Sequence, residues 1–343
     1  MAAVEVLRDP SLAGLPVVVG GRGDPTPRGV DSTASYEARA FGVGSGMPLR
    51  IAVRKAPDAV FLPVHAPLYT AASEGVMAAL RSLGPTDGAV VEVLGWDEAF
   101  VGVTTDDPVG VARRIQAAVL AETRLHCSIG IGDTKVMAKT ATNFGKPRGV
   151  FTITADTWFE VMGGRPTDAL WGVGRKTAAK LAKLGLHTVA ELAVAPAEPL
   201  VARLGPTMGP WYRRIARGGD QSPVNATPWV ARGHGRETTF QENLRDWGVV
   251  EAEVRVLAAR VLDDVVAEGR PAVRVGLKIR YAPFESHTTS RALPEPTYDP
   301  AVVTAAAVAL LTRFDATRAV RLLGVRLEMQ PPHPTSPSTF LGE

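Results

Sequence analysis

The sequence predicts a multidomain protein of the α+β class, and three observations support this fold class. Residues 1–156 alternate short apolar runs with amphipathic stretches around one hairpin pattern, as in a mixed α+β domain. Residues 157–220 change to short helical patterns separated by glycines. A polar, proline-containing linker at 221–231 precedes a second α+β segment at 232–330, and the Pro/Ser-rich tail at 331–343 is predicted to be disordered.

The first segment is predicted to place helices around a central hairpin. The apolar run VVVGG is stopped by its glycines, which is typical of a short strand. The run AVVEVLGWDEAFVGVT is predicted to form two apolar strands joined by a tight turn, with Asp97 and Glu98 at or near that turn. In chain order we expect a strand at 17–21, helices at 34–43 and 67–84, the hairpin at 89–104, a helix at 108–122, a strand at 125–132 and a helix at 133–149.

The later segments are predicted to be helical first and then to form a small domain of two helices and four strands. Residues 272–282 alternate apolar and basic side chains, and this period of two indicates a strand with one buried face. We expect short helices at 158–162, 168–185 and 189–193, then strands at 236–240, 272–282, 288–296 and 320–329 with helices at 249–268 and 299–314.

The composition is that of a globular protein, with 45% hydrophobic and 21% charged residues. The single cysteine, Cys127, excludes an internal disulfide and a cysteine-only metal cage, which fits a reducing compartment. The sequence has no apolar run long enough to span a bilayer, and its N-terminus lacks the pattern of a signal peptide. We therefore expect a cytoplasmic monomer with no membrane partner.

Positive charge is concentrated in the middle of the chain. Residues 160–231 carry nine basic and five acidic side chains, a net charge of +4, whereas residues 1–159 carry 15 and 16. A basic segment suits a polyanionic partner such as nucleic acid. Solvated helix faces would give the same count, so charge alone leaves both interpretations open.

Two neighbouring carboxylates, Asp97 and Glu98, lie at the turn of the predicted hairpin. Magnesium prefers one or two carboxylates together with substrate phosphates, and two such ions can activate a hydroxyl and stabilise a leaving phosphate oxygen. An acidic pair in a turn can also be merely solvated.

Three further side chains are candidates for binding phosphate. Tyr36 and Arg39 are three residues apart on a predicted helix and so share a face, where arginine can grip a phosphate bidentately. Lys146 follows a predicted helix and suits a phosphate as a compact charge. The alternatives are an ordinary surface arginine beside a half-buried tyrosine, and a lysine that caps a helix C-terminus.

The run LWGVGRKTAAKLAKLG at 170–185 has the pattern of a helix-hairpin-helix. Gly172 and Gly174 allow close approach of backbone N–H groups, and the following helix carries Lys176 in its first turn. A helix N-terminus of this kind favours a phosphate and grips a DNA backbone without reading its sequence. An ordinary helix-packing element is the alternative.

These motifs occur together in the order found in Y-family DNA polymerases, and the chain resembles the bacterial DNA polymerase IV type of that family. The resemblance extends over residues 3–329 and rests on an ordered set of segments: SYEARAFGVGSGMPL, VEVLGWDEAFVGV, CSIGIGDTKVMAKTATNFGKPRGV, LWGVGRKTAAKLAKLG, RETTF, VGLKIRYAPFESHTTSRALPEPT and VRLLGVRLEM. It implies a right-hand polymerase with palm and fingers, a helical thumb with a helix-hairpin-helix, and an α+β little finger domain.

The resemblance assigns domains along the chain. It implies a palm at 1–156 with the fingers inserted at about 10–66, a thumb at 157–220, and a little finger at 232–330 after the linker at 221–231.

The resemblance also assigns roles to residues. It implies that Asp97 and Glu98 are catalytic and bind metal, and that Tyr36, Arg39 and Lys146 hold the incoming triphosphate. The DNA-binding residues implied in the thumb and little finger are Gly172, Gly174, Lys176, Arg321 and Arg326.

The implied activity is low-fidelity, template-directed DNA synthesis past damaged bases, which would serve DNA repair. The implied cofactor is a pair of Mg²⁺ ions, with Mn²⁺ as the alternative, and the implied partners are primer-template DNA and a dNTP. A sliding clamp is a further candidate partner, although the tail shows no clear clamp-binding peptide.

The sequence departs from the family pattern at its start. The family opens with a strand that carries Asp-x-Asp-x-Phe, whose first aspartate bridges both metals, whereas MAAVEVL matches the residues located after that motif. We therefore expect Met1 to fall on the steric gate position, which screens the sugar 2′-hydroxyl. Two interpretations remain: an active polymerase whose start lies upstream, or a catalytically impaired DNA-binding relative. A third, a DNA glycosylase, lacks any evident Lys-Asp arrangement after the hairpin.

Overall fold

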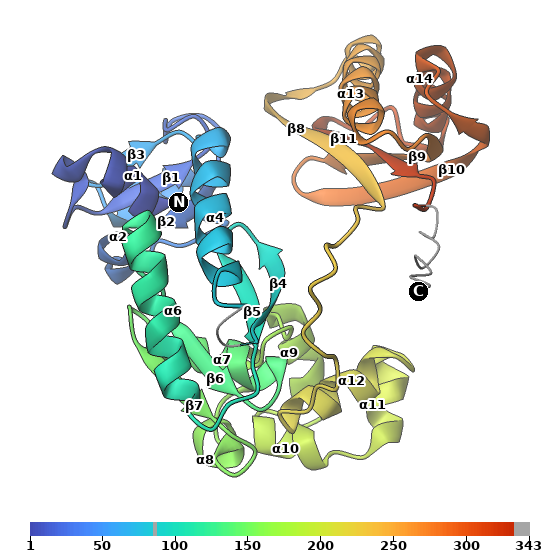
Figure 1. The fold of residues 1–343 in the computed structure, drawn as a ribbon. Coiled ribbons are helices and arrows are strands. Elements are labelled where there is room, and N and C mark those ends of the chain that lie inside the picture. Colours follow the sequence, from blue (N-terminus) through green and yellow to red (C-terminus); the bar gives the residue numbers. More distant parts are fainter. Residues whose placement is uncertain (85–87, 333–343) are drawn as a thin grey trace, which may run out of the picture. The chain divides into compact units, whose positions relative to one another are not determined.

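The computed structural model describes residues 1–84 and 88–332 and divides into two compact units (Figure 1). The first unit contains Met1–Gly14 and His65–Pro228, and the second contains Leu15–Val64 together with the chain from Trp229 onward. Within the described residues no helix is long and apolar enough to cross a membrane. Of the tail predicted to be disordered at 331–343, only residues 331 and 332 are described, and both lie outside helices and strands.

The first unit contains two small sheets, covered by helices, and a helical bundle. Its elements in chain order are α1 (Ala2–Arg8), α4 (Ala66–Arg81), β4 (Val90–Gly95), β5 (Glu98–Gly102), α6 (Pro108–Thr123), β6 (Ile129–Gly132), α7 (Lys135–Gly145) and β7 (Val150–Ile153), followed by α8 (Trp158–Met162), α9 (Arg175–Ala182), α10 (Val189–Val194), α11 (Ala197–Leu204) and α12 (Met208–Ala216). Strands β4 and β5 form an antiparallel hairpin, and β6 and β7 pair in parallel. The described residues show no ladder between these two sheets.

Two hydrophobic clusters hold the first unit together. Apolar side chains of α4 and α6, spaced to share a helix face, pack on the β4–β5 hairpin, with Leu80, Val91 and Ile115 buried between them. The second cluster joins α7 and β7 to the helices α8–α12, and its largest member is the fully buried Trp158. Helix α7 thus contacts both the bundle and the strands, which fixes its orientation beside the hairpin.

The second unit contains a small sheet, formed by residues 15–64, and a larger one. Its elements are β1 (Val17–Gly20), β2 (Asp31–Ala34), α2 (Tyr36–Ala40), α3 (Leu49–Lys55), β3 (Val60–Leu62), β8 (Gly233–Leu244), α13 (Trp247–Glu268), β9 (Ala272–Tyr281), β10 (Glu285–Thr297), α14 (Pro300–Ala309) and β11 (Val320–Met329). The small sheet has the order β2-β1-β3, and the larger one has the order β10-β9-β11-β8.

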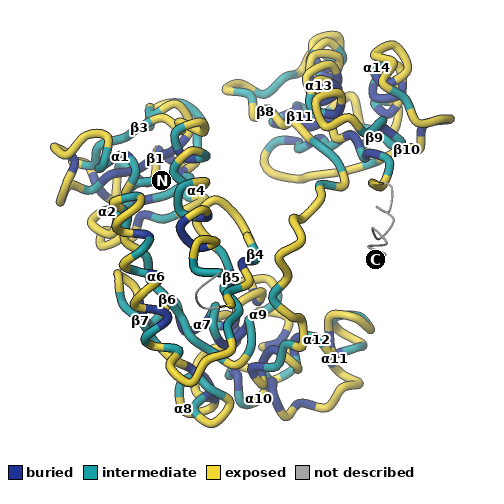
Figure 2. The backbone as a smooth tube through the Cα atoms, in the orientation of Figure 1, coloured by how far each residue is buried: buried dark blue, intermediate teal, exposed yellow. Residues whose placement is uncertain are grey.

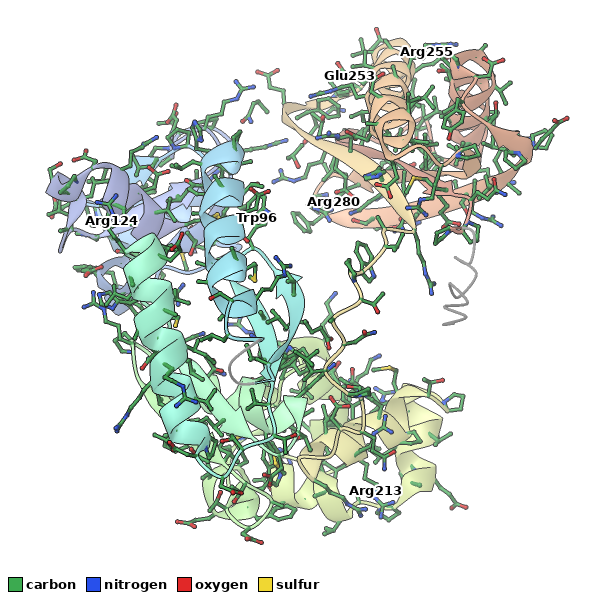
Figure 3. The ribbon with its side chains drawn as sticks, viewed as in Figure 1. Trp96, Arg124, Arg213, Glu253, Arg255 and Arg280 are labelled. Carbon is green, nitrogen blue, oxygen red and sulfur yellow. The ribbon has the colours of Figure 1, made fainter. Side chains whose placement is uncertain are left out.

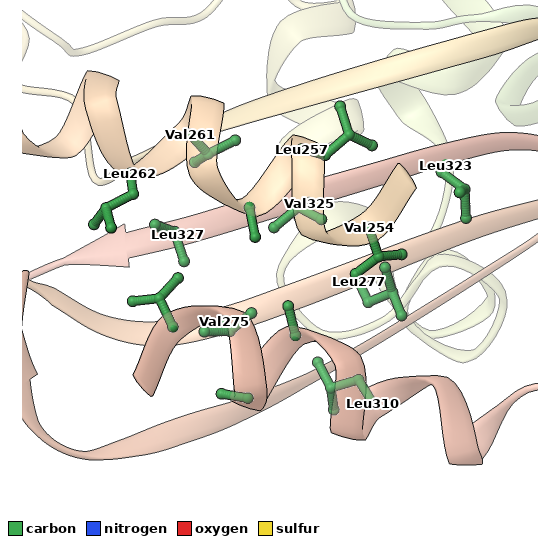
Figure 4. Close-up of a cluster of buried hydrophobic side chains, with 14 of the residues drawn as sticks. Val254, Leu257, Val261, Leu262, Val275, Leu277, Leu310, Leu323, Val325 and Leu327 are labelled. Carbon is green, nitrogen blue, oxygen red and sulfur yellow. The ribbon is translucent and has the colours of Figure 1, made fainter. Parts of the chain in front are cut away.

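Helices α13 and α14 cover one face of the larger sheet, and the core lies between the two layers (Figure 4). Strand β9 buries Val275, Leu277 and Ile279 on this face, as its alternating sequence predicts. The intervening side chains, among them Lys278 and Arg280, lie on the opposite face and are half-buried, whereas the edge strand β10 is exposed along most of its length (Figure 2). The larger sheet therefore presents one apolar face to its own helices and one basic, accessible face.

The sequence predicted most of these elements but missed several short ones. Strands β2, β3 and β7 and helices α3, α11 and α12 were not expected. The helix expected at 168–185 is α9 alone, preceded by a 3₁₀ turn, Thr167–Ala169, and the helix expected at 299–314 is α14 followed by a 3₁₀ turn, Leu310–Arg313. Strand β2 has the polar sequence DSTA, and β1 pairs with β2 and β3 across intervening loops. Non-local pairing of this kind stabilises strands whose own composition does not indicate them.

Candidate active site and DNA-contact surfaces

The β4–β5 hairpin presents Asp97 and Glu98 to solvent. Gly95 pairs with Glu98 across the ladder, so Trp96 and Asp97 form the turn, as the sequence predicts. The Trp96 ring lies 6.3 Å from the ring of Tyr69 on α4, and this aromatic pair anchors the turn (Figure 3). Asp97 and Glu98 are therefore exposed at a turn that the Trp96–Tyr69 contact stabilises.

Helix α7 supplies a lysine to each acidic position of the hairpin strands. Lys139 Nζ donates a hydrogen bond to Glu98 Oε1 at 2.5 Å, and Lys135 Nζ donates to Glu92 Oε2 at 2.6 Å. Burial acts to raise the pKa of Glu92, but hydrogen bonds from Lys135 and from the Asn225 N–H outweigh it and leave the pKa lowered. The lysine spacing of four residues places both charges on one face of α7, so each lysine meets one glutamate of the hairpin.

A buried acid near the hairpin was missed by the sequence analysis. Glu5 on α1 is fully buried, accepts a hydrogen bond from the Tyr69 hydroxyl at 2.5 Å, and pairs with Arg8 at 2.7 Å. Burial, and then the hydrogen bond to Glu5, raise the pKa of Tyr69 to about 12. The Met1 amine lies close enough to Asp97 and Glu5 for both to act on its pKa, which burial nevertheless lowers. Met1, for which the gate role stays a prediction, is thus within electrostatic range of Asp97.

The exposed carboxylates fit a divalent ion as a two-ligand site. Magnesium binds through one or two carboxylates and completes its shell with water and substrate phosphates, which matches Asp97 and Glu98. Among residues 1–84 and 88–332 no group of three His, Cys, Asp or Glu side chains could hold a metal. Because Lys139 occupies one oxygen of Glu98, a metal there would have to compete with this ion pair.

Tyr36 and Arg39 lie together on α2 in the second unit. Ser35 caps the helix by accepting a hydrogen bond from the Ala38 N–H, and its hydroxyl also accepts one from Val17 on β1. The Arg39 guanidinium lies 5.4 Å from the centre of the Tyr36 ring, and both side chains are exposed. The pair is therefore accessible and preorganised to meet an anion.

Lys146 belongs to the first unit, as do Asp97 and Glu98. It is the residue that ends α7, the helix whose first half carries the lysines bound to the hairpin, and it is exposed. Lys146 and the lysine that binds Glu98 are therefore positioned by the same helix, α7.

The predicted helix-hairpin-helix lies immediately before α9. Gly172 has a φ of +92°, and Val173 is buried, which forms a tight turn. Gly174 is the N-cap of α9 with no side-chain cap, and the following Lys176 is exposed. The first N–H groups of α9 are therefore available to an anionic ligand.

We expect Gly172→Ala to destabilise the first unit by about 1–3 kcal/mol. The alanine would have to keep the left-handed φ of Gly172, and its Cβ would lie 2.6 Å from Trp211 Cη2. Gly174→Ala is the matched control: its φ is −86°, and a Cβ there meets nothing within 4 Å. Thermal unfolding of both variants would test this, and equal melting temperatures would contradict the steric argument.

The predicted little finger arginines differ in their surroundings. Arg326 on β11 is exposed and lies opposite Gly276 of β9, where no side chain covers it from that strand. Arg321 is half-buried; burial lowers its pKa, and the positive charges of Arg28, Arg280 and Arg50 lower it further. The sequence analysis did not predict that Arg28, Arg50 and Arg280 lie near Arg321, because they come from separate segments of the chain.

Comparisons with known proteins agree with this architecture. The model of the impB/mucB/samB family matches residues 1–143, and that of its C-terminal domain matches residues 231–335. "DNA polymerase IV 2" of Mycobacterium tuberculosis is 49% identical over 333 residues, covering 96% of this chain and 95% of the relative. "DNA polymerase IV" of Methanoculleus marisnigri is 38% identical over 336 residues, covering 96% and 91%.

Solved structures of Y-family DNA polymerases are also similar to this chain. A Y-family DNA polymerase chimera of Dbh and Dpo4 matches with a TM-score of 0.83 at 25% identity, covering 95% of each chain. An insertion ternary complex of Dbh DNA polymerase matches with a TM-score of 0.64 at 25% identity, covering 96% of this chain and 95% of that one.

Proposed function

The chain belongs to the Y family of DNA-directed DNA polymerases, and on that basis we propose that it extends a primer with low fidelity past damaged template bases. In the proposed reaction the primer 3′-hydroxyl attacks the α-phosphorus of a dNTP, a new phosphodiester bond forms, and pyrophosphate leaves. The observation that carries this proposal is the pair Asp97 and Glu98, exposed side by side at an anchored hairpin turn.

The metal site of the proposal consists of the two hairpin carboxylates. Bound there, divalent ions would lower the pKa of the attacking hydroxyl and neutralise the leaving pyrophosphate. Lys139 orients the Glu98 carboxylate by donating a hydrogen bond to it. We propose Mg²⁺ as the physiological ion because the donors are carboxylate oxygens.

We propose that Tyr36 and Arg39 bind phosphates of the incoming dNTP, and that Lys146 is a further phosphate-binding residue, as the family resemblance implies. Arg39 suits the role because its Nε is fixed by the Ala34 carbonyl at 3.0 Å, which leaves the rest of the guanidinium free to bind phosphate. Lys146 adds a compact charge from the end of α7.

Primer-template DNA is the proposed macromolecular partner. The uncapped start of α9 with Lys176 would grip the backbone, and Arg326 would contact it from the open sheet face. The Dbh ternary complex, a structural neighbour, supports a DNA and nucleotide complex for this chain.

A primer-extension assay with labelled primer-template, all four dNTPs and Mg²⁺ or Mn²⁺ tests the function. We expect template-directed addition, including opposite an abasic site. Tight DNA binding without addition in either metal would instead support the impaired, DNA-binding alternative.

We expect Arg39→Ala to raise the KM for dNTP roughly 10- to 100-fold, because a charge-assisted hydrogen bond to phosphate contributes about 1.5–3 kcal/mol. Arg39→Lys should fall between, since lysine keeps the charge but loses the bidentate geometry. Arg54→Ala, an arginine on α3, is the control and should leave KM unchanged. An unaltered KM in Arg39→Ala would refute the assignment.

A further inference from the structure

A hollow in the helical bundle of the first unit is lined largely by arginines. Its volume is about 340 Å³, which lies within the range of small-molecule sites. The lining residues come from the start of α11, from α12 and from the loop after it: Ala197, Pro210, Arg213, Arg214, Arg217 and Gly219. Three of these six residues are basic and none is acidic, so the hollow suits an anion.

The sequence of α12 brings the three arginines together. Arg213 and Arg214 lie in the last turn of the helix, and Arg217 is its C-cap, four and three residues further on, so it neighbours both on the helix surface. The Arg217 Nε donates a hydrogen bond to the Ala193 carbonyl at 2.7 Å, which ties this side chain to α10. Its two Nη groups are left to meet a ligand.

Arg213 carries a buried donor that has no partner in the described part of the chain. This residue lies on α12 at the position labelled in Figure 3, and its side chain is half-buried. Its Nε is withdrawn from solvent and forms no hydrogen bond. An unpaired charged donor is unfavourable, and an oxyanion in the hollow would supply the missing acceptor.

No carboxylate balances the charge of these arginines. Within residues 1–84 and 88–332, none of the three forms an ion pair. The dipole of α12 favours cations near its C-terminus and would explain arginines that point into solvent. It does not explain three arginines around one hollow, or the buried Nε of Arg213.

Arg213 lies on the side of α12 away from the predicted helix-hairpin-helix. Trp211 lies against that hairpin, because a Cβ added at Gly172 would meet Trp211 Cη2 at 2.6 Å. Arg213 is two residues further along α12 and therefore about 200° around the helix from Trp211. The hollow is thus separate from the start of α9, which is proposed to grip the DNA backbone.

We propose that Arg213, Arg214 and Arg217 bind a small molecule that carries two or three linked phosphate groups. Phosphate oxygens accept charge-assisted hydrogen bonds from arginine, and three unbalanced positive charges suit a di- or triphosphate. A single phosphate would meet the same donors but would leave much of the hollow empty. A DNA strand is another source of phosphate, but a donor withdrawn from solvent is reached more easily by a compact ligand than by a strand on the surface. The proposal goes beyond the polymerase function and does not depend on it.

Isothermal titration calorimetry with inorganic triphosphate, in magnesium-free buffer with EDTA, tests the site on the full chain. The titrations use the Arg39→Ala chain, because Arg39 is itself proposed to bind a triphosphate, and we expect binding to remain in it. Added to that chain, Arg213→Met keeps the apolar stem but removes the guanidinium, and Arg214→Ala removes an exposed guanidinium. Each should weaken triphosphate binding roughly 10- to 100-fold. Inorganic phosphate should bind about 10-fold more weakly than triphosphate, since it reaches fewer of the donors.

Arg203→Ala is the matched control, because Arg203 is an exposed arginine in the last turn of α11 that does not line the hollow. It should leave triphosphate affinity unchanged. Absence of triphosphate binding in the Arg39→Ala chain would overturn the proposal, as would unaltered affinity in both test variants or equal binding of phosphate and triphosphate. Anisotropy with labelled primer-template should show unchanged DNA affinity in the test variants. If they weaken DNA binding and not triphosphate binding, the arginines contact DNA and the proposal is wrong.

Discussion

Replacing Asp97 with asparagine is expected to reduce single-turnover nucleotide addition by on the order of 10³-fold while leaving primer-template affinity within about twofold. Asparagine keeps the size of the side chain but removes the charge that a divalent ion requires. The carboxylate of Asp97 is exposed and lies in the turn between β4 and β5, outside the ladder itself, so the hairpin should persist. The loss should therefore be one of chemistry and not of folding.

The control for Asp97→Asn is Asp106→Asn, an exposed acid that follows the same hairpin. Rapid-quench addition with Mg²⁺ and anisotropy on labelled primer-template would be measured for both variants. If Asp97→Asn adds nucleotide at the rate of the unsubstituted chain, the metal assignment is wrong. If it loses DNA affinity as well, Asp97 would be supporting the fold and not the reaction.

The elements with a clear hydrophobic period could be predicted from the sequence. The alternation on β9 and the long amphipathic pattern of α13 each determine which side chains are buried, so both elements were expected within a few residues. The hairpin was predictable because two apolar strands flank a short turn, and this placed Asp97 and Glu98 correctly at its rim.

The partners of these side chains could not be predicted, because they come from far along the chain. The spacing of Lys135 and Lys139 indicates a shared face, but the acids they bind lie about 40 positions earlier. Arg28 meets β8 across more than 200 residues, and no local pattern indicates such a contact. For the same reason the sequence analysis named Arg321 but not the arginines whose charges act on it, Arg28, Arg50 and Arg280.

The burial of the ionisable residue Asp31 could not be predicted from the sequence either. Asp31 begins β2, where its polar neighbours suggest a solvated loop, yet only 1% of its surface is exposed. Neither carboxylate oxygen meets hydrogen-bond geometry with a described partner. Burial raises its pKa to about 6, although the Thr33 N–H and the Arg39 guanidinium lie close enough to oppose the shift.

We therefore expect Asp31→Val to increase the free energy of unfolding at neutral pH by about 3 kcal/mol. The folded pKa of about 6 lies about two pH units above the ordinary value of 3.8, and each pH unit corresponds to about 1.4 kcal/mol. Valine also favours a strand position and removes two buried acceptors.

The pH dependence of this gain has a definite sign. Because the folded state holds the Asp31 proton more tightly than the unfolded state, the native protein binds more protons between about pH 4 and pH 6, and stability falls as pH rises through that window. The advantage of Asp31→Val should thus be largest above about pH 7. Below about pH 4, where the carboxyl is neutral in both states, its electrostatic part should vanish.

Urea unfolding at neutral and mildly acidic pH would measure the effect, with Asp58→Asn as an exposed carboxylate control in the same segment. Asp31→Asn removes the charge but keeps a polar side chain. It should show the pH-dependent part of the increase in unfolding free energy, but less of the total increase, because an unpaired amide would still be buried. A gain that is the same at both pH values would mean that folding does not shift the pKa of Asp31, as for a solvated carboxylate. Measuring the dNTP KM of Asp31→Val would then show whether the buried charge also positions Arg39, since the two charges interact and Arg39 is proposed to bind the triphosphate.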